Sequence, residues 1–301
     1  MASATVREVE IGSDRSGQRL DNFLMRELGN VPRALVYRLI RTGQVRVNGG
    51  RAKPMRKLAA GDRIRVPPVR EQAPAASLPA ERIDQARKAI LHRQEEFLVL
   101  DKPSGIASQG GSGLAWGLND LVAAIDDRAV PVHRLDRETS GLMVFALGRQ
   151  PASELQRAFK RQTVEKRYLA LLHGHLRDEV TVIDAPLKKI RDGSGQHRVI
   201  ADPDGQPAKT TFKRLERFRR HDFVEATIES GRTHQIRVHA LEGGAPVAGD
   251  ERYNPGRTTP GLERLFLHAA FLRLPWPDDQ VFSSPLPEEL TAVIDGLRGA
   301  R

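Results

Sequence analysis

The sequence predicts an α+β protein in two parts, a small helix–helix–hairpin module followed by a larger domain built mainly on paired antiparallel strands. Three observations lead to this fold class. The length of 301 residues exceeds that of one small domain. The apolar residues of the first quarter follow a helical period. Several later segments alternate between apolar and polar residues, as half-buried strands do.

The charge of the chain is concentrated near its N-terminus. Lys and Arg number 48 against 38 Asp and Glu, a net charge of +10. Residues 15–70 contain 14 of the basic residues and 3 of the acidic ones, so the excess lies in the first quarter. A basic module on a neutral body favours a polyanionic partner, most simply nucleic acid. A solvated basic surface is the alternative.

The composition excludes several classes of protein. Without cysteine the chain has no disulfides and no thiolate metal sites. Its apolar runs stay short of the roughly 18 residues that span a bilayer, and the N-terminus has no hydrophobic signal core. We therefore expect a soluble, cytoplasmic protein.

The basic module begins with two predicted helices. Residues 18–28 place their leucines and Phe23 on one helical face. Pro32 suits the first turn of a second helix, which Gly43 can end. A hairpin should follow, because residues 45–47 alternate before the turn signal Asn48-Gly49 and residues 63–66 form a second short strand.

The run LIRTGQVRVNG in this module resembles the RNA-binding domain of ribosomal small-subunit protein four, also called the alpha-L motif, over about residues 17–67. In that family the second helix and the next loop follow the RNA backbone. The resemblance implies phosphate contacts by a set of arginines, although each could be merely solvated. The candidates are Arg33, Arg38, Arg41, Arg46 and Arg51.

The domain boundaries follow from a change in composition. Residues 71–79, EQAPAASLP, are rich in Pro, Ala and Ser with little periodicity, which is typical of a linker. We assign residues 1–67 to the first domain, 68–87 to the linker and 88–301 to the second domain.

The larger domain alternates strands and helices. A strand at 97–100 ends in the turn Asp101-Lys102-Pro103-Ser104-Gly105, and a glycine-rich loop at 109–113 follows that fits neither phosphate-binding fingerprint. The remaining elements are predicted from their periodicity: helices at 152–162, 233–241 and 287–297, and strands at 142–146, 164–172, 209–218, 223–228 and 265–274, with a long hairpin region at 185–205.

The stretch 132–146, VHRLDRETSGLMVFA, places Asp136 between arginines just before an apolar strand. Its carboxylate has three interpretations: a structural ion pair, a turn cap, or a catalytic group kept ionised by guanidinium partners. Tyr168, in a strand, is either a packing residue or a platform for a base. His234 and His239 are five residues apart and do not share a helical face, so we expect no metal site.

Five motifs in order, LDKPSG, HRLDRETSG, EKRYLALLHG, GRTHQIRVH and LFLHA, resemble the RluA-type pseudouridine synthases over about residues 88–275. The segments QGGSGL and APLKKI are similar to those of the RluC-like subgroup that acts on 23S large-subunit ribosomal RNA. Gln109 and Ser230 depart from the residues common there. The resemblance implies an α+β catalytic domain whose mixed, largely antiparallel bent sheet carries the active site in a cleft.

The resemblance also implies roles for five residues. Asp136 is the catalytic aspartate, as nucleophile or as base, and Arg237 is its basic partner. Tyr168 stacks on the base, and Ile236 packs on the other side of the ring. Arg134 fills the space that a flipped uridine leaves.

The expected activity is site-specific isomerisation of uridine to pseudouridine, which needs no cofactor because no atoms are gained or lost. We expect RNA, most simply 23S rRNA, as the partner of a monomer, with no membrane and no metal. The alternatives are a tRNA or dual-specificity synthase, a non-catalytic RNA-binding or ribosome-assembly factor, and a hydrolase that uses Asp136.

Overall fold

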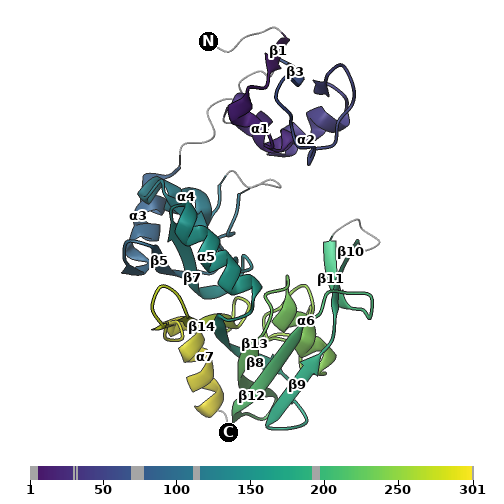
Figure 1. Cartoon of the computed structure of the whole chain (residues 1–301). Coiled ribbons are helices and arrows are strands. Elements are labelled where there is room, and N and C mark those ends of the chain that lie inside the picture. The colour runs from purple at the N-terminus through teal and green to yellow at the C-terminus, as the bar shows by residue number, and fades with distance from the viewer. Residues whose placement is uncertain are drawn as a thin grey trace. The chain divides into compact units, whose positions relative to one another are not determined.

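The structure, a computed structural model, describes residues 6–29, 31, 33–68, 78–110, 116–191 and 197–299, with only the backbone at residues 14, 33 and 34 (Figure 1). The chain divides into two compact units, the first formed by residues 1–79 and 109–117 and the second by residues 80–108 and 118–301. The two units are described separately below.

The N-terminal unit packs two helices on a three-stranded antiparallel sheet of order β1-β3-β2. Its elements are β1 (Arg7–Glu10), η1 (Ser13–Arg15), α1 (Leu20–Glu27), α2 (Arg33–Arg41), β2 (Arg46–Val47) and β3 (Arg63–Val66). Phe23 and Leu24 of α1 pack with Val36 and Ile40 of α2 and with Ile64 of β3 in one core. The predicted helix–helix–hairpin arrangement is confirmed, and β1 adds an edge strand.

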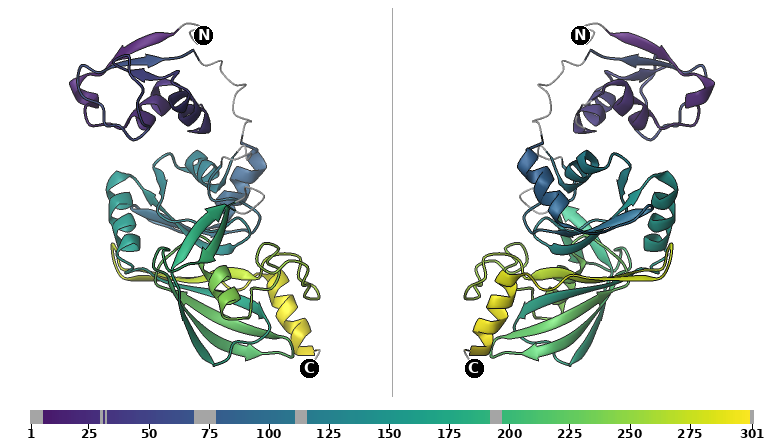
Figure 2. Two further views of the ribbon diagram at one scale, coloured as in Figure 1. Left: turned by 90° about the vertical axis from the view of Figure 1, so that its right-hand side faces the viewer. Right: turned by 90° about the vertical axis from the view of Figure 1, so that its left-hand side faces the viewer.

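The second unit is larger and mixes helices with strands (Figure 2). Its first elements are α3 (Ala80–Lys88), β4 (Ile90–Arg93), β5 (Phe97–Lys102), α4 (Leu118–Ile125), β6 (Ala129–Pro131), β7 (Ser140–Leu147) and α5 (Arg149–Lys160). Next come β8 (Glu165–His173), β9 (Val180–Asp184), β10 (Leu187–Arg191), β11 (His197–Ala201), β12 (Lys209–Arg217) and β13 (His221–Ile228). The last are α6 (Gln235–Glu242), β14 (Leu267–Leu274), β15 (Gln280–Ser283) and α7 (Glu288–Gly299).

A ten-stranded sheet forms the body of this unit, in the order β4-β5-β7-β14-β8-β13-β12-β9, with β15 on β14 and β6 on β7. Only β7 and β14 pair in parallel, and all other neighbours are antiparallel. The predicted α+β class with a mixed, largely antiparallel sheet is therefore confirmed. Strands β10 and β11 form a separate antiparallel ribbon.

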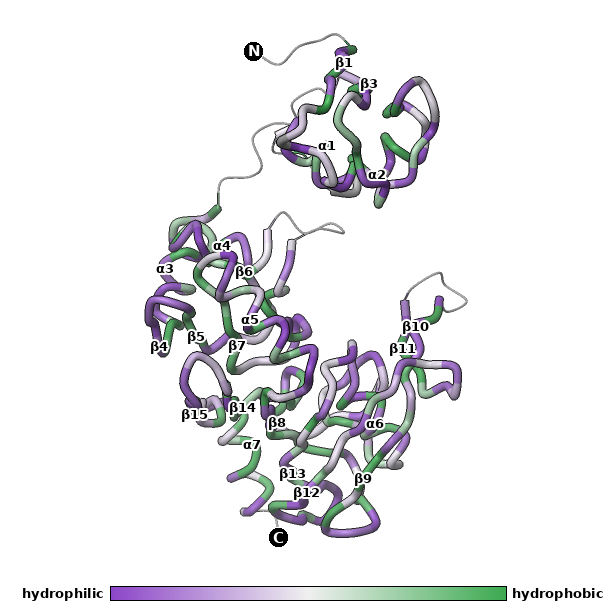
Figure 3. The backbone as a smooth tube through the Cα atoms, viewed as in Figure 1, coloured by the Kyte–Doolittle hydropathy of each residue, from purple (hydrophilic) through white to green (hydrophobic). Residues whose placement is uncertain are grey.

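The two faces of the sheet are covered by different helices. Along β8, Ala170 and Leu172 pack with Ile236 of α6, whereas Leu171, which points to the other face, packs with Leu290 of α7. This alternation is what the period of two predicts for a strand buried on both sides. The strands β5 and β7 are apolar along most of their length (Figure 3), and α5 packs on one of their two buried faces.

Residues 80–87, which the sequence analysis assigned to the linker, form most of α3 and belong to the second unit. The helix contacts α4, and Ala86 is buried. Only one residue of α3 is buried. A helix with so little buried surface needs no apolar stripe, and its sequence therefore resembles that of a polar linker.

Gly141 lies where β7 meets β14. The two strands pair there over only two residues, His268 with Ser140 and Ala269 with Gly141. A Cβ on Gly141 would lie 2.3 Å from the carbonyl oxygen of Ala269, and its φ is +113°. Only glycine permits this close approach. The glycine of HRLDRETSG thus joins the halves of the sheet five residues after Asp136.

Candidate active site

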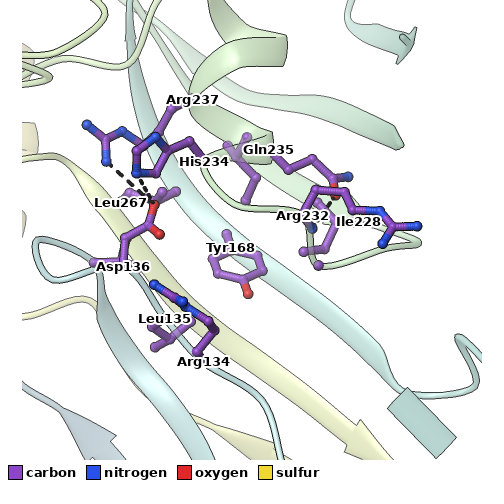
Figure 4. Close-up of a pocket in the computed structure, with 13 residues that line it drawn as sticks. Arg134, Leu135, Asp136, Tyr168, Ile228, Arg232, His234, Gln235, Arg237 and Leu267 are labelled. Carbon is purple, nitrogen blue, oxygen red and sulfur yellow. Dashed lines mark hydrogen bonds and ion pairs between the residues drawn. The ribbon is translucent and has the colours of Figure 1, made fainter. Parts of the chain in front are cut away.

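One pocket of the second unit brings together all five site residues proposed from the sequence (Figure 4). Its lining comes from the loop before β7, the strand β8, the end of β13, the helix α6 and the strand β14. The lining includes Arg134, Asp136, Tyr168, Ile236 and Arg237. Segments that are far apart in the sequence, from Arg134 to Leu267, therefore converge on one cleft.

The loop that carries Asp136 is held by the turn that follows β5. The backbone N–H of Gly105 donates to the carbonyl oxygen of Arg137 at 2.8 Å, and the Arg137 Nε donates to that of Gly105 at 3.0 Å. The Ser104 hydroxyl donates to the Glu138 carbonyl at 2.7 Å. On the other side of Asp136, Ser108 bonds both the N–H and the carbonyl of Leu135. These bonds fix the backbone on both sides of Asp136.

Lys102 completes this support from inside the protein. Its side chain is fully buried, and its Nζ donates to the carbonyl oxygens of Pro103 at 3.0 Å and Arg137 at 3.1 Å. Burial lowers the pKa of Lys102 to about 7, against the opposing effect of Glu138 and Asp136. Arg137 thus links the two loops.

Replacing Lys102 by methionine should change how stability depends on pH. The folded protein binds the proton of the Lys102 ammonium group less tightly than the unfolded chain does. Above about pH 7 the unfolded chain therefore holds more protons, and the free energy of unfolding rises with pH. The variant lacks this contribution. The free energy of unfolding of wild type should therefore rise relative to that of the variant by at most on the order of 1 kcal/mol per pH unit. Urea unfolding of both between about pH 6 and about pH 9 measures it. Parallel curves would mean that the lysine stays charged.

Arg237 has a closer partner than the one expected. Its Nε and Nη2 each lie 2.7 Å from a carboxylate oxygen of Asp250, whereas its Nη1 lies 3.5 Å from Asp136 Oδ2. Asp250 is fully buried, and the Asp136 side chain is 16% exposed. The two acids therefore differ: Asp250 anchors the guanidinium, and Asp136 uses its remaining nitrogen while staying open to a ligand.

The electrostatics of Arg237 follow from these contacts. Burial alone would lower the pKa of Arg237, but the paired hydrogen bonds with Asp250 and the charges of Asp136 and Glu138 raise it above its usual value. The guanidinium is thus a permanent positive charge beside Asp136. The sequence analysis missed Asp250. Its only local signal is an acid directly after Gly249, whose tight turn (φ +72°) leaves no room for a Cβ.

His234 is a second neighbour of Asp136 that the sequence analysis did not propose. Its Nε2 lies 3.9 Å from Asp136 Oδ2, and its Nδ1 lies 2.8 Å from the Tyr253 hydroxyl, which accepts the Val199 N–H at 3.2 Å. Burial lowers the pKa of His234, so the ring is neutral at neutral pH. A tyrosine hydroxyl that donates to Nδ1 leaves the ring proton on Nε2, facing Asp136. His234 also holds the left-handed conformation (φ 55°) that starts α6.

Tyr168 and Ile236 form the apolar part of the pocket. Tyr168 is 8% exposed, and its ring lies between Asp136 and Arg232 in Figure 4. Ile236 belongs to the same buried cluster as Tyr168. Burial, with a smaller effect from Asp136, raises the pKa of Tyr168 above its usual 10, so the phenol stays protonated. Both side chains line the pocket, and aromatic and aliphatic surfaces suit a planar ring.

Arg134 stands at the mouth of the pocket. It is exposed, and within the described part of the chain no hydrogen bond or ion pair holds its side chain. Its side chain makes no ion pair with Glu138, whose carboxylate instead lies 3.7 Å from Arg237 Nη1. Arg134 is thus a planar cation that is available to a ligand.

The N-terminal arginines differ in their surroundings. Arg38 and Arg41 are exposed on α2 and line a hollow of their unit. Arg46 donates to the Gly43 and Gly49 carbonyls at 3.3 and 3.1 Å, so it folds back on its own loop. Arg51 is exposed and lies near Gly43. The side chain of Arg33 lies outside the described residues.

Two features are absent from the described residues. They contain no group of three or more His, Cys, Asp or Glu that could hold a metal ion. They also contain no helix that is both long enough and apolar enough to cross a membrane.

Comparison with known proteins places this site and fold in a family. The family model for RNA pseudouridylate synthase matches residues 96–242, and the S4 domain matches residues 18–64. Ribosomal large subunit pseudouridine synthase C of Vibrio vulnificus is 40% identical, with 98% of each chain covered. The protein of that name from Escherichia coli is 39% identical, with 99% of this chain and 98% of the relative covered.

Solved structures agree with these matches. The human RNA pseudouridylate synthase domain containing 4 protein has a TM-score of 0.61 at 25% identity, with 72% of this chain and 96% of that chain covered. The human RNA pseudouridylate synthase domain containing 1 protein has a TM-score of 0.57 at 26% identity, with 70% of this chain and 94% of that chain covered.

The fold and the matches define the class as an RNA-modifying enzyme with an S4-type RNA-binding module. The chain belongs to the RNA pseudouridylate synthase family, and it isomerises uridine to pseudouridine in RNA.

Proposed function

We propose that the enzyme modifies specific uridines of large-subunit ribosomal RNA. The observation that carries this target is the match over 98% of the chain to relatives curated as large-subunit synthases, at about 40% identity. The proposal includes a monomeric enzyme that acts in the cytoplasm. It also includes a reaction without a metal or cofactor, since pseudouridine is an isomer of uridine.

We propose Asp136 as the group that starts the reaction. The isomerisation breaks the bond from the ribose to ring nitrogen 1, turns the base, and joins it again through carbon 5. A carboxylate can begin this as a nucleophile or as a base on the sugar, and in both cases it must be ionised. The Arg237 Nη1 at 3.5 Å and the partial exposure of Asp136 support this role.

We propose Tyr168 and Ile236 as the surfaces that hold the base after its bond to the sugar is broken. The detached ring must stay within the pocket while it turns, so stacking between an aromatic and an aliphatic side chain is suited to it. The protonated phenol of Tyr168 can also assist the proton shift at carbon 5.

Arg134 is proposed to fill the space that the flipped uridine leaves. Replacing it by glutamine should lower the rate about 10- to 100-fold on a target uridine within a stem, because unstacking costs a few kcal/mol. On an unstructured oligonucleotide, where the uridine is already unstacked, the loss should be only a few-fold. Single-turnover rates on both RNAs measure this. Equal losses on the two would argue against the wedge.

We propose that residues 1–67 are the RNA anchor, 68–87 include the linker and 88–301 contain the catalytic machinery, with α3 (Ala80–Lys88) kept with the catalytic part. Deleting residues 1–78 should weaken rRNA binding and flatten its salt dependence by about 0.7 to 0.9 in slope for each phosphate that the module neutralises. Binding is measured by filter retention at several salt concentrations. An unchanged slope would remove the anchor role.

Pseudouridine mapping of total RNA with and without the gene tests the proposed target. We expect pseudouridine to disappear from one or a few positions of large-subunit rRNA and to return with the wild-type gene. Loss confined to tRNA, or shared with tRNA, would favour the tRNA or dual-specificity alternative. Rescue of ribosome assembly by an Asp136→Ala variant would favour the assembly-factor alternative.

A further inference from the structure

A hollow of about 540 Å³ lies on the N-terminal unit, between α2 and the segment that follows residue 51. Its floor is apolar: Ile40 is 2% exposed, and Ala52 and Pro54 are half-buried. Tyr37 forms one wall and is 40% exposed, although large aromatic side chains are usually well covered. The other lining residues are Arg38, Arg41 and Lys53.

The walls of this hollow are fixed by a buried carboxylate. Asp21 of α1 is fully buried and accepts the Tyr37 hydroxyl at 2.8 Å. Arg19 holds the same carboxylate with two bonds of 3.0 and 2.6 Å. The backbone N–H of Asp21 donates to the Pro54 carbonyl oxygen at 3.0 Å, which ties the opposite wall to the same helix. The Tyr37 side chain is therefore held at its hydroxyl end while the residue stays exposed beside the hollow.

The cations at the rim are free to bind an anion. Within the described part of the chain, the side chains of Arg38, Arg41 and Lys53 make no hydrogen bond and no ion pair, and all three are exposed. Arg46, in contrast, is bound to its own loop. Like charges around one hollow repel each other, and a bound anion would offset this.

We propose that this hollow binds one unpaired RNA nucleotide, with its base on Tyr37 and its phosphate at Arg38, Arg41 and Lys53. An open aromatic face, an apolar floor and unpartnered cations are what a splayed-out nucleotide requires. A helical phosphate backbone alone would use the cations but not the aromatic wall. The inference rests on the proposed RNA-anchoring role of the module and adds to it a preference for unpaired residues.

Three RNAs that differ at one residue test this inference with the full-length protein. The first is a blunt, fully paired duplex, the second has one bulged adenosine, and the third has an abasic residue at the bulge. Adenosine is chosen because the catalytic pocket cannot isomerise it. By fluorescence anisotropy at fixed salt, wild type should bind the bulged adenosine about tenfold more tightly than the other two, which is within the range of base–aromatic stacking.

Two replacements of Tyr37 separate stacking from the bond to Asp21. Tyr37→Leu removes the ring and should abolish the preference. Tyr37→Phe removes only the hydroxyl and should retain it. Equal binding of the three RNAs by wild type, or a preference that survives in Tyr37→Leu, would overturn the inference.

The rim cations have their own control. Arg38→Gln, Arg41→Gln and Lys53→Gln should weaken binding of all three RNAs, and Lys57→Gln, which removes an exposed charge outside the hollow, should weaken it less. If the rim variants weaken binding of all RNAs but wild type shows no preference, the anchor role stands and this inference fails. If neither the rim variants nor the 1–78 deletion affects binding, the anchor role itself fails.

Discussion

Replacing Asp136 by asparagine is expected to lower the rate of isomerisation at least about 10³-fold while RNA affinity stays within a few-fold of wild type. Asparagine keeps the shape of the side chain but is neither a nucleophile nor a base at neutral pH. Asp136 is 16% exposed and sits in a loop held by backbone bonds, so the fold should be unaffected. Single-turnover assays and RNA binding of the same preparation measure both quantities.

Glu138 offers a matched control for this prediction. Its carboxylate lies 3.7 Å from the same Arg237 nitrogen, but it is 52% exposed. Glu138→Gln also removes one negative charge near the guanidinium, and its rate should remain within several-fold of wild type. Wild-type turnover by Asp136→Asn, or equal losses in the two variants, would contradict the assignment of Asp136 as the reacting group.

Arg237→Met is expected to lose both activity and stability, for different reasons. Removing the guanidinium leaves Asp250, which is fully buried, without its partner, and this should cost about 3–5 kcal/mol in the free energy of unfolding. Activity falls because Asp136 loses the guanidinium nitrogen that orients its carboxylate. Inactivity of this single variant therefore cannot be attributed to the site alone.

A second substitution separates the two effects. Asp250→Asn still accepts the backbone N–H groups of Arg252 and Tyr253, which bond to Asp250 Oδ1 at 3.0 and 3.1 Å. In Arg237→Met/Asp250→Asn no buried charge is unpaired, so roughly half or more of the lost stability should return. Activity should stay at least about 100-fold below wild type. Urea unfolding and single-turnover rates measure the two quantities, and recovery of activity along with stability would make Arg237 a purely structural residue.

Features encoded by local patterns could be predicted well. Alternation of apolar and polar residues correctly indicated the strands β8, β12 and β13. Apolar stripes indicated the helices α1, α2, α5 and α7. Each element was placed within a few residues of its observed bounds. Helices α3 and α4 were missed. The first has only one buried residue, and the second follows a glycine-rich stretch whose composition suggests a loop.

The five residues proposed for the catalytic site lie together in the structure, but the contacts between them and their neighbours were not predicted. All five residues proposed for the catalytic site line one pocket. They could be proposed because each lies in a recognisable sequence motif. Asp250 and His234 were not proposed, since an acid after a glycine and a lone histidine have many structural explanations. Arg137 was not proposed for any role, because its partner Gly105 lies 32 residues away.

Residue types and their spacing along the chain were therefore sufficient for the fold class, the family resemblance and the choice of Asp136. Which charge pairs with which became known only from the folded chain. Arg237 takes Asp250 at 2.7 Å as its main partner and reaches Asp136 only at 3.5 Å. Folding also brings Lys53 to the hollow beside Tyr37, Arg38 and Arg41 of α2. Such pairings depend on distances and burial between distant segments, which no local pattern contains.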